Sequence, residues 1–209
     1  LRSAVLILFM LSYLLLITLI EPILIQIQWG TMLAIVCASL SIGLLEETAI
    51  RGVMLPLFCE KWHEKKHVYL KAAVVTSLLF ACIHLNWSVR YFLANGHLTW
   101  EYLSGNLYQV YYTFAFGMLA AGVTMYAKSI WPMVFWHGMC DFAAFFIDGI
   151  MPPVSLYYYH NNENVLTFRN VLRTYGISLG TKSDEVIIES IINLILVLVG
   201  IHLLRKAEF

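Results

Sequence analysis

Charged residues are scarce in this sequence. They make up 12% of its 209 residues, whereas a soluble globular domain contains about 25%. Hydrophobic residues account for 60%, and the mean hydropathy is +0.75. We therefore expect an integral membrane protein. The 13 basic residues balance the 13 acidic ones, and no basic stripe or zinc-finger spacing occurs, so a nucleic-acid partner is not expected.

The sequence also lacks a CxxC pair, an HExxH motif, an internal repeat and a low-complexity tract. Its cysteines are scattered singly, at Cys37, Cys59, Cys82 and Cys140, and we interpret them as small apolar core residues. Because Cys140 follows His137 by about one helical turn, a cysteine nucleophile there is a minor alternative. With no sign of a second domain, we expect one integral-membrane domain over residues 1–209.

Long apolar segments dominate the chain. A helix needs about 20 mostly apolar residues to span a bilayer, and six segments qualify: 4–27, 31–58, 70–87, 107–127, 129–149 and 185–204. The predicted fold class is therefore all-α, a polytopic membrane bundle of about six transmembrane helices. We interpret 4–27 as a retained helix, because it has no small-residue cleavage pattern and continues past Glu21-Pro22. Residues 88–106, with a turn at Asn95-Gly96, are expected at the membrane interface.

Basic residues are divided unequally between the two sets of connections. Eight share a side with both termini: Arg2, Lys61, Lys65, Lys66, Lys71, Lys128, Arg205 and Lys206. Four fall on the other side: Arg90, Arg169, Arg173 and Lys182. Because cytoplasmic connections carry the excess of lysine and arginine, both termini are predicted to be cytoplasmic. The expected location is a bacterial cell membrane.

Ionisable residues occur inside three of the apolar segments. They form the patterns Glu46-Glu47-x-x-x-Arg51, Phe80-x-x-x-His84 and His137-x-x-x-Asp141. A charged residue at the bilayer centre costs about 2.5–3.5 kcal/mol even on the mildest scale, so such residues are usually functional.

The three patterns also agree in depth. At 1.5 Å per residue from the predicted cytoplasmic ends, Glu46, His84, His137 and Asp141 lie about 13–21 Å from one face of a bilayer about 30 Å thick. This agreement predicts one site between the second, third and fifth spans.

Helical spacing predicts how residues within a pattern relate. Glu47 and Arg51 lie one turn apart and are expected to form an ion pair. Glu46 lies about 100° around the helix from Glu47 and is left to face the reaction centre. For each pattern alone, a structural ion pair, a packed core histidine or a structural His–Asp hydrogen bond is the alternative interpretation.

In this order, the EExxxR, FxxxH and HxxxN/D patterns resemble those of the CPBP family, also named Abi. That family contains CAAX prenyl proteases and bacteriocin-processing or self-immunity proteins. The resemblance covers a motif core of about residues 41–142 and implies an intramembrane endopeptidase. By motif, Glu46 and His84 would activate a water molecule, and His137 and Asp141 would hold the developing oxyanion. The supporting residues would be Glu47, Arg51 and Phe80.

The chain departs from the prenyl-protease branch at Asp141, where that branch has Asn. An Asn side chain offers an N–H donor, whereas an ionised Asp offers none and repels an oxyanion. Asp141 must therefore be protonated, or must orient His137 as an imidazolium. The departure weakens the case for a prenylated substrate. A peptide or membrane-protein substrate within the lipid bilayer is expected, in a bacterial processing, regulatory or immunity role.

No cofactor is predicted. Two histidines and several carboxylates suit zinc, but Arg51 would place a cation beside the metal, so zinc is not favoured. Two other functions stay open. One is a catalytically silent bacteriocin-immunity or regulatory scaffold that binds a membrane partner. The other, less favoured, is a proton-coupled transporter, because buried acids and histidines also form proton relays, although no inverted repeat is visible.

The sequence does not indicate the oligomeric state. Small residues at Gly117, Ala120, Ala121 and Gly122 suit close helix packing, either within the chain or between chains.

Overall fold

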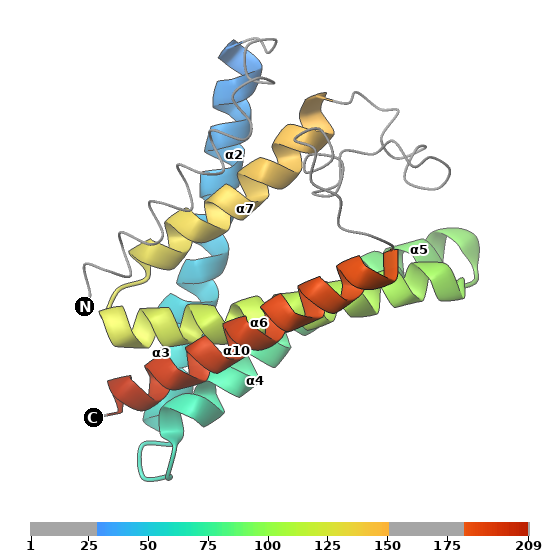
Figure 1. The fold of residues 1–209 in the computed structure, drawn as a ribbon. Coiled ribbons are helices and arrows are strands. Elements are labelled where there is room, and N and C mark those ends of the chain that lie inside the picture. The colour runs from blue at the N-terminus through green and yellow to red at the C-terminus, as the bar shows by residue number, and fades with distance from the viewer. Residues whose placement is uncertain (1–28, 151–181, 209) are drawn as a thin grey trace. The chain divides into compact units, whose positions relative to one another are not determined.

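The computed structural model describes residues 29–150 and 182–208. Within these ranges every regular element is a helix and there is no strand, which confirms the all-α class. The chain forms two compact units (Figure 1). Unit 1 comprises residues 1–45 and 132–187, and unit 2 comprises residues 46–131 and 188–209. The single domain over 1–209 stays a prediction.

In the described part of the chain, four helical stretches are long and apolar enough to cross a membrane. They are Met32–Lys61, Val68–Asn95, Asn106–Ala127 and Ser190–Ala207, which match four of the six predicted spans. The span expected at 129–149 coincides with helix α7, Trp131–Ile150, but α7 is not among the four. The span expected at 4–27 lies outside the described residues. Six spans therefore stay a prediction.

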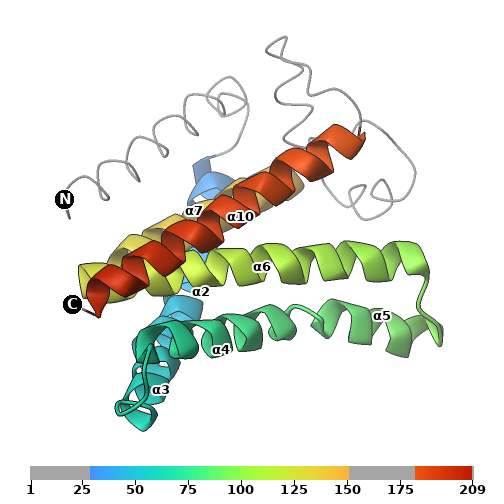
Figure 2. The ribbon, with the colours of Figure 1, turned by 60° about the horizontal axis from the view of Figure 1, so that its bottom comes forward.

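Unit 2 is organised around the long helix α6, Trp100–Ala127. Helix α4, Val68–Ile83, packs along it, and α5, Asn86–Asn95, continues beyond α4 beside the same helix (Figure 2). The turn predicted at Asn95-Gly96 is confirmed, because α5 ends at Asn95 and Gly96 has a φ of 72°. Glycine adopts this left-handed conformation without the steric cost of a Cβ atom.

Small residues let α6 approach its two neighbours closely. A Cβ atom on Gly117 would lie 2.8 Å from the Cβ of Ser77 on α4. One on Gly122 would lie 2.6 Å from the carbonyl oxygen of Gly200 on α10, Lys182–Ala207. Real Cβ atoms do not come this close to other atoms, so neither site accepts a side chain without a shift. The close packing predicted at Gly117 and Gly122 thus occurs within the chain.

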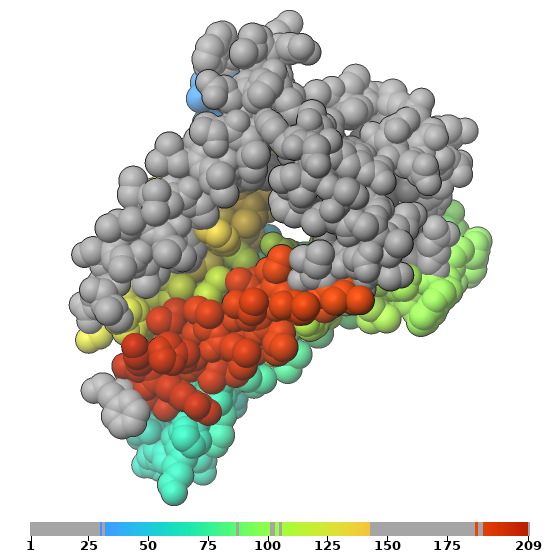
Figure 3. All heavy atoms as spheres, viewed as in Figure 1, coloured from blue at the N-terminus to red at the C-terminus, as the bar shows by residue number. Residues whose placement is uncertain are grey.

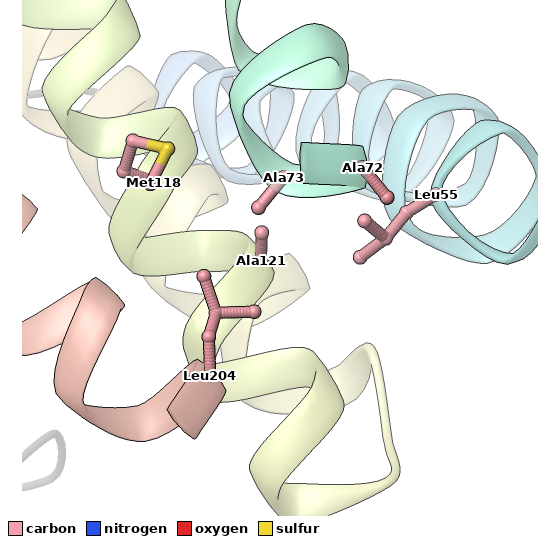
Figure 4. Close-up of a cluster of buried hydrophobic side chains, with 6 residues drawn as sticks. All are labelled: Leu55, Ala72, Ala73, Met118, Ala121 and Leu204. Carbon is pink, nitrogen blue, oxygen red and sulfur yellow. The ribbon is translucent and has the colours of Figure 1, made fainter. Parts of the chain in front are cut away.

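One end of unit 2 holds its apolar core. Six buried side chains from α3, α4, α6 and α10 form one cluster (Figure 4): Leu55, Ala72, Ala73, Met118, Ala121 and Leu204. At the same end, the backbone N–H of Tyr69 donates a hydrogen bond of 3.1 Å to Oε1 of Glu208. This bond satisfies one of the N–H groups that the first turn of α4 leaves without a helical partner.

The outer surface of α10 is apolar. The part of α10 drawn in red is open to view in Figure 3, and the exposed side chains of this helix include Ile191, Leu194, Ile195, Leu198 and Val199. Apolar exposure of this extent on a helix of membrane length suits contact with lipid rather than water.

Unit 1 contains the crossing of α2, Trp29–Glu47, with α7. A Cβ atom on Gly43 would lie 2.7 Å from the backbone nitrogen of Gly138 and 2.8 Å from the carbonyl oxygen of Val134. The two helices therefore meet backbone to backbone, as small residues allow in membrane proteins.

Candidate active site

The first pattern lies where the second predicted span changes its helical form. After α2 ends at Glu47, the chain continues through the π-helix η1, Thr48–Met54, into α3, Leu55–Lys61. The N–H of Leu55 donates to the carbonyl oxygen of Ile50, five residues back, which defines the wider π turn. Wide turns of this kind occur frequently at functional sites.

Pro56 explains the widening. In an ordinary α-helix its ring would clash with the carbonyl group four residues back, and it has no N–H to donate. The structure places it in the first turn of α3, directly after the π segment. The span predicted over 31–58 is thus helical but contains a π segment, and Pro56 is the sequence signal for this irregularity.

Glu47 and Arg51 form the predicted ion pair. Nη1 of Arg51 donates a hydrogen bond of 3.0 Å to Oε1 of Glu47, and the two side chains are 1% and 0% exposed. Glu46, the preceding residue, is half-buried and also interacts electrostatically with Arg51, more weakly than Glu47 does. The pair thus supplies a neutralised, buried support directly beside Glu46.

The ring of Phe80 joins the second pattern to the first. The Cζ atom of Arg51 lies 4.6 Å from the centroid of this ring, within the range of a cation–π interaction. Phe80 is only 2% exposed, so the contact is shielded from solvent. Arg51 therefore has Glu47 on its own helix and an aromatic face on α4.

His84 lies at a break between two helices. Helix α4 ends at Ile83, and the backbone N–H of His84 donates to the carbonyl oxygen of Ala81 at 3.1 Å, three residues back. The span predicted over 70–87 therefore contains a turn between α4 and α5, which was not predicted from the sequence. Non-helical backbone at membrane depth occurs where it is buried in protein or lines a hydrated cavity, and both settings suit a reactive site.

The preceding turn of α4 holds the imidazole of His84. Its Nδ1 lies 3.0 Å from the carbonyl oxygen of Phe80. A carbonyl oxygen only accepts hydrogen bonds, so Nδ1 carries the hydrogen atom and Nε2 of the neutral ring keeps its lone pair. The rings of Phe80 and His84 also meet edge to face, with centroids 5.1 Å apart and planes inclined by 81°.

These contacts form one continuous series within unit 2. It runs from Glu47 to Arg51, then to Phe80 and His84. Four of the seven predicted site residues are thus joined by direct contacts, and Glu46 precedes the first of them in the chain.

The third pattern lies on α7 in unit 1. His137 is buried at 8% exposure, and Asp141 is half-buried one turn further along the same helix. Gly138, at the close crossing with α2, is adjacent to His137, and its partner Gly43 precedes Glu46 by three residues. Sequence reasoning missed both glycines. The approach of His137 and Asp141 to Glu46 and His84 stays a prediction.

The family of the chain follows from the residues that carry these patterns. Among known protein families, the one described as type II CAAX prenyl endopeptidase Rce1-like matches residues 28–143, more than half of the sequence. The chain belongs to this Rce1-like family. No curated protein and no solved structure gives a significant match.

Membership of the Rce1-like family confirms the resemblance seen in the sequence and extends it slightly. The matched range contains all three patterns and reaches back to residue 28, before the predicted motif core of 41–142. In general terms, an Rce1-like protein is a CAAX-type intramembrane endopeptidase. The family and the four apolar helices together show that the chain is an integral membrane protein.

A metal site was not favoured for this Rce1-like chain. In residues 29–150 and 182–208, no group of three or more His, Cys, Asp or Glu side chains gathers in a way that could hold a metal ion. Metal independence nevertheless stays a prediction, which a chelator experiment tests.

Proposed function

We propose that this chain is a glutamate-type, metal-independent intramembrane protease. It hydrolyses a peptide bond in a peptide or membrane-protein substrate, using water activated by Glu46 and His84. The observation that carries the proposal is the contact between Nδ1 of His84 and the carbonyl oxygen of Phe80. This contact selects the tautomer whose Nε2 accepts a proton, as a general base requires.

The reaction begins with proton transfer from water. Nε2 of His84 and the carboxylate of Glu46 share the role of base, and the resulting hydroxide attacks the carbonyl carbon of the scissile bond. The bond between carbon and nitrogen then breaks, and the proton passes from the base to the leaving amine. A positioned general base of this kind contributes about 10²–10⁴-fold to the rate.

His137 and Asp141 stabilise the negative charge that develops on the carbonyl oxygen. One donor to an oxyanion is worth about 2.7–4 kcal/mol. Asp141 donates only in its protonated form, and its alternative role is to orient His137 as an imidazolium. The family match supports the proposal because it covers both residues.

The remaining predicted residues support the base. The opposite charges of Glu47 and Arg51 cancel next to Glu46. Arg51 of this pair also contacts the ring of Phe80, which lies beside His84. We also infer that the end of unit 2 that carries the basic residues faces the cytoplasm, because the excess of lysine and arginine in short connections is cytoplasmic.

Cleavage assays on purified protein test this function. The substrates are a library of quenched-fluorescent peptides, together with a prenylated CAAX peptide and its unprenylated twin. Glu46→Gln and His84→Gln should each abolish cleavage without unfolding the protein. The matched controls are Glu60→Gln and His63→Gln, which alter exposed residues near the end of the same long helical stretch and should cleave like the unmodified chain.

The outcomes separate the candidate functions. Activity that survives a chelator but not Glu46→Gln supports the metal-independent mechanism, whereas chelator-sensitive activity restored by zinc contradicts it. Preference for the prenylated peptide over its twin would identify the substrate class. If the folded protein cleaves none of these substrates, the regulatory or immunity scaffold becomes the better interpretation.

A further inference from the structure

Phe80 occupies a position that its size alone does not explain. Its ring is 2% exposed and touches two different functional groups. The guanidinium of Arg51 lies 4.6 Å from the ring centroid, and the imidazole of His84 meets the ring nearly at a right angle. The residue thus contacts one group from each of the first two patterns.

We propose that Phe80 is a positioning residue. Its ring, held against Arg51, fixes the plane of the His84 imidazole, so the Glu47–Arg51 ion pair acts on His84 through Phe80. This inference rests on the proposed function, because the orientation of His84 affects cleavage only if its imidazole acts as the base. The aromatic ring thus joins the two patterns and does more than fill core volume.

The geometry of the histidine supports this role. The hydrogen bond from Nδ1 to the Phe80 carbonyl oxygen fixes one atom of the imidazole, but it leaves the ring able to tilt about that bond. The edge-to-face contact with the Phe80 ring, at 81°, restricts the tilt. The first restraint comes from the backbone of Phe80 and the second from its ring, so the direction of Nε2 depends on the Phe80 ring being held in place.

Arg51 is what holds the ring. A buried cation attracts the negative face of an aromatic ring, and this attraction strengthens when water is excluded. Arg51 is in turn fixed by its hydrogen bond to Glu47. Through these contacts, Arg51 in the π segment restrains Phe80, and Phe80 in turn restrains His84 at the break in α4. An aliphatic residue of similar volume would fill the space but would not attract the guanidinium.

Fluorinated phenylalanines at position 80 distinguish attraction from packing. Mono-, di- and trifluorination withdraws electron density from the ring face while changing its shape little. We expect kcat to fall stepwise along this series while KM changes little, with Phe80→Leu the most impaired, by about 10²-fold, as a small misplacement of a catalytic group can cause. Phe80→Tyr, which keeps an aromatic face, should retain more activity than Phe80→Leu.

Phe116 is the matched control. It is a buried aromatic residue on α6 of the same unit, at 4% exposure. Fluorination of Phe116 should leave kcat unchanged, and Phe116→Leu should lower thermal stability about as much as Phe80→Leu does. A kcat that is insensitive to fluorination at position 80, or equally sensitive at both positions, overturns the proposal.

A second measurement does not depend on protease activity. Nitrogen NMR of labelled histidine rings, with His84 assigned through His84→Gln, reports which ring nitrogen carries the hydrogen. The folded protein should show His84 with its hydrogen on Nδ1 and with sharp ring signals. Phe80→Leu keeps the backbone carbonyl oxygen that accepts from Nδ1 but loses the ring that restricts the tilt of the imidazole, so the His84 signals should broaden through exchange between ring orientations. If the His84 signals broaden in this way while no substrate is cleaved, the positioning role stands and the protease function fails. Equally sharp His84 signals in folded Phe80→Leu contradict the positioning role itself.

Discussion

Arg51 donates a 3.0 Å hydrogen bond to the carboxylate of Glu47, and the two side chains are 1% and 0% exposed. Burial of such a pair has two opposing consequences. Removal of charged groups from water is costly, so the pair as a whole adds little stability. Loss of one partner leaves an uncompensated charge in an apolar setting, and this costs about 3–5 kcal/mol.

Glu47→Gln should therefore lower the free energy of unfolding by about 3–5 kcal/mol, because it leaves the buried Arg51 without its counter-charge. The double variant Glu47→Gln with Arg51→Met removes both charges and should recover most of that loss. Thermal or chaotrope unfolding in detergent measures these changes. Glu64→Gln is the matched control, because Glu64 faces His63 in an exposed pair and its loss should change stability little. Equal effects at Glu47 and Glu64 would contradict a buried-charge explanation.

The π segment leads to a prediction about Pro56. Pro56→Ala restores an N–H group and removes the clash that favours the wide turn, so the segment should tighten towards an ordinary α-helix. One residue of register corresponds to about 100° of rotation, which would turn Glu46 and Glu47 away from their neighbours. We expect the free energy of unfolding to stay the same or rise. We expect kcat to fall by at least about 10²-fold, because a small misplacement of reacting groups has an effect of this size.

Unfolding and cleavage measurements on one preparation test the Pro56 prediction. Leu57→Ala is the control, because it alters an exposed side chain next to Pro56 on α3 and leaves the backbone N–H groups unchanged, and it should leave kcat unaltered. Pro56→Ala with full activity would show that the π segment has no part in the site.

The sequence predicted the parts of this architecture that depend on local pattern. Hydropathy located the four described stretches that are long and apolar enough to cross a membrane, because membrane-length apolar segments have few alternatives to a helix. The spacing of Glu47 and Arg51 predicted their contact because residues four apart share a helix face. Neither inference requires knowledge of a neighbouring helix.

The remaining features depend on packing between helices. Arg51 and Phe80 come from different helices, and no periodicity within either helix predicts that one side chain lies over the other. The break at His84 is not marked by an adjacent glycine or proline. The sequence places His84 in a functional pattern, but it does not reveal the contact of Nδ1 with the carbonyl oxygen of Phe80, which selects the tautomer.

The contact between Gly43 and Gly138 leads to a steric prediction. A Cβ atom on Gly43 would lie within 2.7–2.8 Å of backbone atoms of α7, and backbone cannot move aside as a flexible side chain can. Gly43→Val should therefore separate α2 from α7 and destabilise the protein, by about 1–3 kcal/mol as overpacking does. Gly30→Ala is the control on the same helix, because a Cβ there meets no described atom within 4 Å. A neutral Gly43→Val would contradict the close crossing.

Asp141 offers the sharpest test of the proposed oxyanion site, because its two proposed roles predict opposite results. If protonated Asp141 donates to the oxyanion, rising pH removes the donor as the carboxyl group ionises, so kcat should fall on the alkaline side. Asp141→Asn keeps an N–H donor at every pH, and we expect it to retain activity and to lose that alkaline decline. If Asp141 instead orients His137 as an imidazolium, the neutral amide removes the counter-charge and kcat should fall at all pH values. The pH profile of kcat for the two proteins decides between these roles, and Asp141→Ala, inactive under both, shows that the position itself is required.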